Sequence, residues 1–167
     1  GDGTVTWTYT VANAATQYLC VGDSATEKFT ITIDDGETGG TVQQVVTVTV
    51  TGTNDAPVIS VADAAGAVTE DVGVSAGNLS DTGTITFDDL DLTDAHTTSV
   101  APDAGNTLGG TLSAVVSDAA TGAGDGTVTW TYTVANAATQ YPGVGDSATE
   151  KCTITTDDGE GGGPGRQ

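Results

Sequence analysis

The sequence predicts an all-β protein, and three observations lead to this expectation. Threonine is abundant and alternates with valine, isoleucine or an aromatic residue, as in Thr127–Val134. β-Branched and aromatic side chains suit the half-buried surface of a pleated sheet. Glycine, aspartate and asparagine cluster between these runs, where turns require them. In addition, a long segment occurs twice, at a spacing that fits one β domain per copy.

Period-two alternation locates the strands of one unit. In Thr127–Val134, Trp130 and Tyr132 occupy alternate positions, so both are expected to point into the core. About seven strands in roughly 110 residues is the size of an immunoglobulin-like β-sandwich. A short helical turn is expected within Ala135–Tyr141. The other strands are expected at Thr41–Thr51, Val58–Val61, Thr84–Phe87, Thr111–Val116 and Glu150–Thr156.

The internal repeat is nearly exact. Gly1–Glu37 recurs as Gly124–Glu160, an offset of 124 − 1 = 123 residues. This period is too long for a solenoid turn or a propeller blade and fits one complete β-sandwich per repeat. The copies differ at four aligned pairs, which are Leu19/Pro142, Cys20/Gly143, Phe29/Cys152 and Ile33/Thr156.

The repeat sets the expected domain organisation. Residues 1–52 form the C-terminal part of one sandwich, and residues 53–167 form most of the next. The second unit has no equivalent of Thr41–Gly52, so it lacks its last strand, and the end of the chain, GGGPGRQ, diverges from the first copy. The strand Thr41–Thr51 is one that a neighbouring chain could donate to the second unit. The absence of methionine further predicts that the sequence is a piece of a longer chain.

The charge balance argues against two classes of partner. The chain has 3 lysine and arginine residues against 23 aspartate and glutamate residues, a net charge of −20. Nucleic acids and anionic membrane surfaces would be repelled. No apolar run approaches the ~20 residues that a membrane-spanning helix needs, so no membrane insertion is expected.

Most carboxylates stand in predicted turns rather than on strands. Calcium takes six to eight oxygen ligands from carboxylates, amides and backbone carbonyls, and clustered acids on loops could supply them. Magnesium would fit less well, because it demands an octahedral site and keeps its waters. Acidic turns also keep secreted proteins soluble, which is the alternative explanation. The four acidic groups are Ile33–Glu37, Gly52–Pro57, Thr69–Asp71 and Phe87–Asp94.

One of these groups resembles a known junction. Residues 53–58, Thr-Asn-Asp-Ala-Pro-Val, resemble the linker between successive cadherin-like domains. In that family an Asx-rich linker and a later Asp-x-Asp pair bind calcium. Asp89-Leu90-Asp91 begins 89 − 55 = 34 residues after Asp55. The resemblance implies calcium at the joint between repeats, where it would stiffen the hinge.

The whole unit also resembles the VCBS repeats of large bacterial surface and secreted proteins. The similar segments are VTVTVTGTNDAPVI, VTEDV, GTITFDDLD with TDAHT, GDGTVTWTYTVAN and FTITIDDG. The resemblance implies tandem extracellular sandwiches, often accompanied by repeat-in-toxin modules and type I secretion. It further implies a non-catalytic role in cell adhesion or biofilm formation, with neighbouring repeats of the same chain as partners.

The candidate calcium ligands combine both lines of reasoning. Several acids held close together repel one another, and a divalent cation would relieve that repulsion. The candidates are Asn54, Asp55, Asp89, Asp91, Asp88, Glu70, Asp34 and Asp35.

Catalytic and zinc sites find little support. His96 is the only histidine, and a triad with Ser99 and Asp94 would join neighbours in sequence, which triads rarely do. A loop or surface position is expected for His96. Cys20 and Cys152 occupy non-equivalent repeat positions, so neither a zinc site nor a disulfide shared by every repeat is indicated. Cys152 stands where the first copy has Phe29, which predicts a void in the core.

A carbohydrate-binding module is the alternative function. Trp7 and Trp130, each followed at the second position by a tyrosine, could form a sugar-stacking platform, although their alternation favours the core. The ligand loops would be Asp94–Asp103 or Ala135–Gly145. Surface glycans or other cells would then be the partners.

Overall fold

The computed structural model shows an all-β protein, as the alternation predicts. Nearly all regular structure consists of antiparallel strands, with two short 3₁₀ turns, η1 (Asn13–Ala15) and η2 (Asn136–Thr139). The structure describes residues 2–121, 125–140, 143, 145–160 and 165–166. The chain divides into two compact units, Gly1–Thr53 and Asn54–Gln167. These are unit 1 and unit 2, in chain order.

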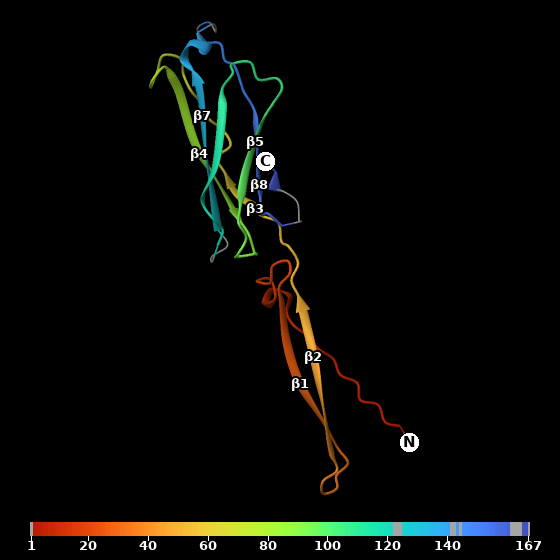
Figure 1. Ribbon diagram of the computed structural model, residues 1–167. Coiled ribbons are helices and arrows are strands. Elements are labelled where there is room, and N and C mark those ends of the chain that lie inside the picture. The colour runs from red at the N-terminus through yellow and green to blue at the C-terminus, as the bar shows by residue number, and fades with distance from the viewer. Residues whose placement is uncertain (1, 122–124, 141–142, 144, 161–164, 167) are drawn as a thin grey trace. The chain divides into compact units, whose positions relative to one another are not determined.

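Unit 1 is built on one long hairpin. Strand β1 (Ser24–Asp34) pairs antiparallel with β2 (Thr41–Thr51) along its whole length (Figure 1). Gly36 has φ +84°, which a glycine adopts without strain, and allows the tight turn between them. The apolar side of this hairpin stays open, because Phe29 is 46% exposed. Within the described part of unit 1, no second sheet covers it.

Unit 2 contains a four-stranded sheet in the order β3-β4-β7-β6 (Figure 1). The central strands β4 (Asn78–Asp88) and β7 (Asp125–Ala135) pair over all eleven residues of each. Strand β3 (Val58–Ala62) flanks β4, and β6 (Thr111–Asp118) flanks β7. Residues far apart in the sequence therefore form the middle of the sheet.

A three-stranded sheet completes unit 2. Strand β8 (Cys152–Asp157) lies between β5 (Thr97–Pro102) and the two-residue β9 (Gly165–Arg166). The Thr98 hydroxyl donates to the Ala114 carbonyl at 2.7 Å and so links β5 to β6 of the other sheet. Within the described residues, no helix is long and apolar enough to cross a membrane.

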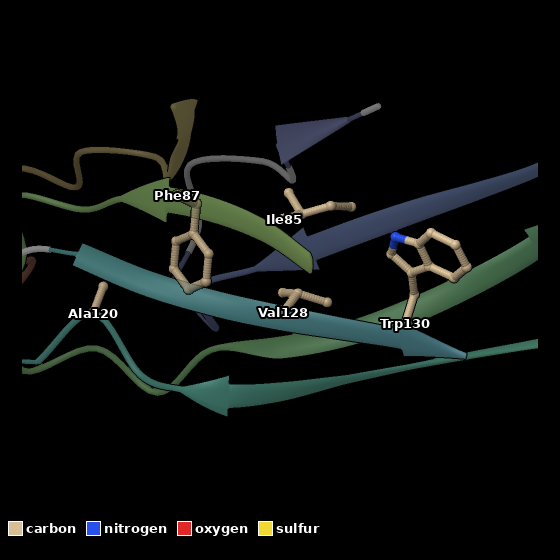
Figure 2. Packing of buried hydrophobic residues seen from close by; sticks show 5 residues of the cluster. All are labelled: Ile85, Phe87, Ala120, Val128 and Trp130. Atoms are coloured by element: carbon tan, nitrogen blue, oxygen red, sulfur yellow. The ribbon is translucent and has the colours of Figure 1, made fainter. Parts of the chain in front are cut away.

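The core of unit 2 follows the predicted alternation. Phe87 and Val128 are fully buried on the paired strands β4 and β7, and Ile154 of the other sheet packs against the same cluster. The Trp130 indole N–H donates to the Asp63 carbonyl at 2.7 Å, which satisfies its one polar group. Figure 2 shows the main members of the cluster, which are Ile85, Phe87, Ala120, Val128 and Trp130.

The structure differs from the expected strands in several places. Strand β4 begins at Asn78, six residues before the predicted Thr84, because pairing with β7 extends it (84 − 78 = 6). Strand β5 was not expected, since Thr97–Pro102 alternates only weakly. The predicted helical turn is η2, and Tyr141 lies outside the described residues. So do residues 161–164 and 167 of the divergent C-terminal stretch.

Trp7 and Trp130 have identical sequence surroundings and different environments. Trp130 is 5% exposed, which confirms its predicted core position. Trp7 is 53% exposed, so the same prediction is wrong for unit 1. The reason is that β7 lies between β4 and β6, whereas residues 2–12 have no strand partner among the described residues.

Candidate metal centre

Three buried carboxylates meet at one end of unit 2. Asp89 directly follows β4, Asp94 precedes β5, and Asp158 directly follows β8. One oxygen atom from each lies within 4.8 Å of the others. Asp89 and Asp158 are each 2% exposed, and Asp94 is 7% exposed. The ends of strands from both sheets thus bring together acids that are far apart in the sequence.

The loop between β4 and β5 is folded around these acids. The Asp91 backbone N–H donates to Asp89 Oδ1 at 2.9 Å. The Asp94 backbone N–H donates to the Asp91 carbonyl at 3.1 Å. These local hydrogen bonds form the tight turns typical of aspartate-rich loops. As a result, Asp89, Asp91 and Asp94 all face the interior, and Asp91 is only 1% exposed.

The segment that precedes β3 is tied to the same acids. The Asn54 side-chain amide donates to Asp158 Oδ2 at 3.1 Å. The Asp55 backbone N–H donates to Asp91 Oδ2 at 2.7 Å. The first two residues of unit 2 therefore contact both acidic loops.

The loop after β8 holds Asp158 in place. Asp158 Oδ1 accepts a hydrogen bond from the Glu160 backbone N–H at 3.0 Å. Asp157 accepts one in the same way from Gly159 at 2.8 Å. Unit 1 contains the same turn, since Asp35 Oδ1 accepts from the Glu37 N–H at 2.9 Å. The repeated Asp-Asp-Gly-Glu sequence therefore forms the same local structure in both copies.

Several buried oxygen atoms at this centre have no hydrogen-bond donor. Within the described residues, they are Asn54 Oδ1, Asp91 Oδ1 and Asp94 Oδ2. A buried acceptor without a partner costs about 1–3 kcal/mol, and more when it carries charge. Native proteins contain few such atoms, and a bound ion is one explanation for them. A cation site would be expected to show such a group, in which buried oxygen atoms without hydrogen-bond donors accompany the Asp89 and Asp158 carboxylates.

The electrostatics of the cluster agree with this interpretation. Burial raises the pKa of the Asp94 carboxyl above its ordinary value, and the nearby carboxylates of Asp91, Asp89, Asp158 and Glu160 raise it further. Both effects disfavour the ionised form of Asp94. A divalent cation among these oxygens would counter both effects.

His96 is part of this region rather than of the surface. Its Nε2 lies 2.8 Å from Asp89 Oδ2, and both side chains are buried. Its ring also packs on Phe87, with the ring centroids 4.8 Å apart. The expected loop position is correct, and the surface position is wrong because the loop folds inward.

The donor set fits calcium. Carboxylate and amide oxygens suit hard cations, whereas zinc prefers nitrogen and sulfur ligands. Three carboxylates, those of Asp89, Asp94 and Asp158, lie close enough to share one ion. Buried oxygen atoms of Asn54 and Asp91 without a hydrogen-bond partner among the described residues are further candidate ligands, and a calcium ion accepts six to eight oxygen ligands.

The candidate ligands named from the sequence divide into two groups. Asp89 belongs to the group of three clustered carboxylates. Asn54 donates to Asp158 of that group, and Asp91 accepts the Asp55 backbone N–H beside it. Asp88 is exposed and faces Asp125 across the β4–β7 pair. The pKa of Asp88 is raised, first because its protonated carboxyl donates a hydrogen bond to Asp125.

The remaining candidates lie away from the centre. Glu70 is exposed, and the adjacent Asp71 accepts a hydrogen bond from Asn136 at 2.7 Å. Asp34 and Asp35 belong to unit 1, are exposed, and cap their own turn.

Two residues of the centre were missed as ligands. Asp94 belongs to the densest acidic group, and its position three residues after Asp91 was a usable signal. Asp158 is the counterpart of Asp35 in the second copy. The repeat could have identified it, because only the second copy has the Asn54 segment and the β4–β5 loop in its own unit.

No protein-family model, curated protein or solved structure matches the chain.

Proposed function

We propose that this chain is a non-catalytic, calcium-binding module of a large extracellular surface or secreted protein, acting in cell adhesion or biofilm formation. The observation that carries the proposal is the buried group of three carboxylates, Asp89, Asp94 and Asp158, together with the buried oxygen atoms of Asn54, Asp91 and Asp94 that have no hydrogen-bond partner among the described residues. The proposed fold is an immunoglobulin- or cadherin-like β-sandwich. Its support is a pair of antiparallel sheets that share one apolar core.

The proposed ligands are the carboxylates of Asp89, Asp91, Asp94 and Asp158 and the amide oxygen of Asn54. The positive charge of the ion would offset the repulsion between these carboxylates. The chain's own residues already connect the segment before β3 to the loops after β4 and β8. Ion binding would strengthen those connections and so fix the path by which the chain enters unit 2.

An ion bound here would affect bending between successive modules, because the site includes the start of unit 2. Asn54 and Asp55 are the first residues of unit 2 and directly follow unit 1 in the chain. A rigid entry segment limits bending between successive modules, whereas a segment held by repelling acids would flex. In a tandem array, neighbouring repeats of the same chain would be the partners, and rigidity would extend the array from the cell surface.

Calorimetric titration of the full chain with calcium chloride tests this function. We expect binding with a dissociation constant of about 1 µM to 1 mM, the range of sensor and extracellular sites. Magnesium should bind more weakly. Asp94→Asn and Asp158→Asn should each weaken calcium binding, and Asp118→Asn, which changes an exposed acid on β6, should leave it unchanged. Equal binding by all three variants, or no heat from the wild type, would remove calcium from the proposal.

A further inference from the structure

His96 connects the apolar core of unit 2 to the acidic cluster. It stands one residue before β5, in the loop that also carries Asp89 and Asp94. Its ring packs on Phe87, with the ring centroids 4.8 Å apart and the two planes inclined by 53°. Phe87 has no exposed surface and belongs to the core cluster. The core therefore holds the imidazole, while its Nε2 atom contacts Asp89.

The contact between His96 and Asp89 is a hydrogen bond that is shielded from water. His96 Nε2 lies 2.8 Å from Asp89 Oδ2, and neither side chain has exposed surface. An ionised carboxylate only accepts hydrogen bonds, so the ring donates its Nε2–H group. Hydrogen bonds to an ionised acceptor are stronger than neutral ones, and a low surrounding dielectric strengthens them further. The two side chains are thus held in one orientation relative to each other.

This bond fixes the second oxygen of the Asp89 carboxylate. Asp89 Oδ1 already accepts the Asp91 backbone N–H at 2.9 Å. A carboxylate has about four acceptor positions on its two oxygens, so the two hydrogen bonds leave the others free and set their direction. One Asp89 oxygen lies within 4.8 Å of a carboxylate oxygen of Asp94 and of Asp158. The free acceptor positions of Asp89 are therefore oriented beside the other acids of the cluster.

His96 supports this cluster without belonging to it. Its nitrogen atoms are not part of the group of oxygens that lie close enough to share an ion. Calcium takes oxygen ligands, so an imidazole nitrogen is not expected to bind it. The other ring nitrogen, Nδ1, is buried and has no hydrogen-bond partner among the described residues. The hydrogen bond that the ring makes in the described part of the chain is thus directed at Asp89.

We infer that His96 is a positioning residue of the calcium site, whose Nε2–H group holds the Asp89 carboxylate in the orientation that binds the ion. This role rests on the proposed function. Groups behind a metal ligand orient it, and their loss typically weakens metal binding by about 10–100-fold. The backbone on the other side of His96 is also anchored, because Thr97 pairs with Asp157, the residue before Asp158. Core packing and strand pairing therefore position the ring, and the ring positions Asp89.

Two substitutions in the full chain separate positioning from packing. His96→Phe keeps a ring beside Phe87 and loses the donor, whereas His96→Gln loses the ring and keeps an N–H group that reaches toward Asp89. In calorimetric titration with calcium chloride, we expect His96→Phe to raise the dissociation constant about tenfold and His96→Gln to stay within about threefold of the wild type. A role in packing alone predicts the reverse order. The reverse order, or equal constants for all three proteins, would overturn the inference.

The single histidine provides a spectroscopic test that needs no variant. His96 is the only histidine of the chain, so nitrogen-15 NMR of the labelled wild type shows one imidazole ring. We expect its Nε2 to carry a proton both in EDTA and in excess calcium. A ring with a proton on Nδ1 and none on Nε2 has no donor for Asp89 and would overturn the inference. Thermal unfolding in EDTA shows whether each variant folds, and this NMR result decides alone if His96→Phe does not.

Failure of this role can be distinguished from failure of the calcium site. A wild type that gives no heat with calcium chloride contradicts the site and the role together. A wild type that binds calcium, with His96→Phe binding equally well, contradicts only the role of His96.

Discussion

The Asn54 amide donates a 3.1 Å hydrogen bond to the Asp158 carboxylate across 104 residues of sequence. This bond joins the first residue of unit 2 to the loop that follows its strand β8. The oxygen of the same amide, Asn54 Oδ1, is buried without a donor among the described residues. The amide therefore satisfies one acid with its N–H group while directing an acceptor into the cluster.

Asp94→Asn should have opposite effects with and without calcium. Without the ion, the change removes a carboxylate that burial and four acidic neighbours disfavour. The free energy of unfolding should rise by about 1 kcal/mol. With calcium present, the variant should gain less stability than the wild type, because it has lost a ligand. Thermal unfolding in EDTA and in excess calcium measures both effects, and a destabilised variant in EDTA would contradict the expected repulsion.

Glu150→Gln should destabilise unit 2. The Glu150 carboxylate accepts hydrogen bonds from Tyr132 and from the backbone of Leu108, Gly109 and Gly110. A glutamine replaces one acceptor oxygen with a donor, so the loss should be about 2–3 kcal/mol in urea unfolding. Glu27→Gln is the matched control, since Glu27 is the exposed counterpart in unit 1. A loss there as large as at Glu150 would show that the carboxylate network is not the cause.

Tyr132 should make stability depend on alkaline pH. Burial raises the pKa of its phenol, and the hydrogen bond to the Glu150 carboxylate and the charge of that group raise it further. A group whose folded pKa is raised contributes stability that is complete below its unfolded pKa, about 10 for tyrosine. That stability is lost as pH rises from there through the folded pKa. Unfolding measured from pH 8 to 12 should show a smaller decline in Tyr132→Phe; an unchanged slope would exclude Tyr132 as the source.

Much of the fold could be predicted because burial follows a simple period. Val128 and Trp130 alternate with threonines in β7, and both are buried as expected. Strand β5 was missed because Thr97–Pro102 has little apolar alternation of its own. It is held by pairing with β8, which a local pattern does not reveal.

The metal centre could be predicted only in part for a similar reason. Asp89 and Asp91 belong to a dense acidic segment, which by itself predicts a cation site. Asp158 has the same local sequence as Asp35, and only the surrounding unit distinguishes a buried acid from an exposed one. Long-range packing thus decides which of two identical motifs enters the cluster.

Gly126→Ala should be much more damaging than Gly3→Ala. The two glycines are counterparts at the offset of 126 − 3 = 123 residues. A Cβ atom at Gly126 would clash with the Phe87 ring, whereas a Cβ at Gly3 has no neighbour within 4 Å. We expect a loss of about 1–3 kcal/mol for Gly126→Ala from overpacking and almost none for Gly3→Ala. Chemical denaturation measures both, and equal small effects would mean that β4 and β7 can separate without cost.

Cys152→Phe should stabilise unit 2. Burial raises the pKa of the Cys152 thiol, and the Glu150 carboxylate adds to this, so the residue is a neutral filler at neutral pH. Phenylalanine is the residue at the matching position of unit 1. It would occupy part of a pocket of about 200 Å³ that Trp130, Tyr132 and Ile154 line beside Cys152. We expect a gain of about 1–2 kcal/mol from the added apolar burial, with a loss for Cys152→Ala. A lower melting temperature for Cys152→Phe would mean that the pocket is too narrow for the ring.

The central position between β4 and β6 has a consequence for how the molecule folds. Asp2–Ala12 and Asp125–Ala135 have the same sequence, and only the second occupies that position. Asp2–Ala12 ends 78 − 12 = 66 residues before β4 begins, and Asp125–Ala135 begins 125 − 88 = 37 residues after β4 ends. The two separations differ by less than twofold. Chain entropy therefore favours the nearer segment by less than about 0.6 kcal/mol. We therefore expect the two identical segments to compete for the position between β4 and β6 during folding, and a chain that places Asp2–Ala12 there would have to unfold before it could reach the native arrangement.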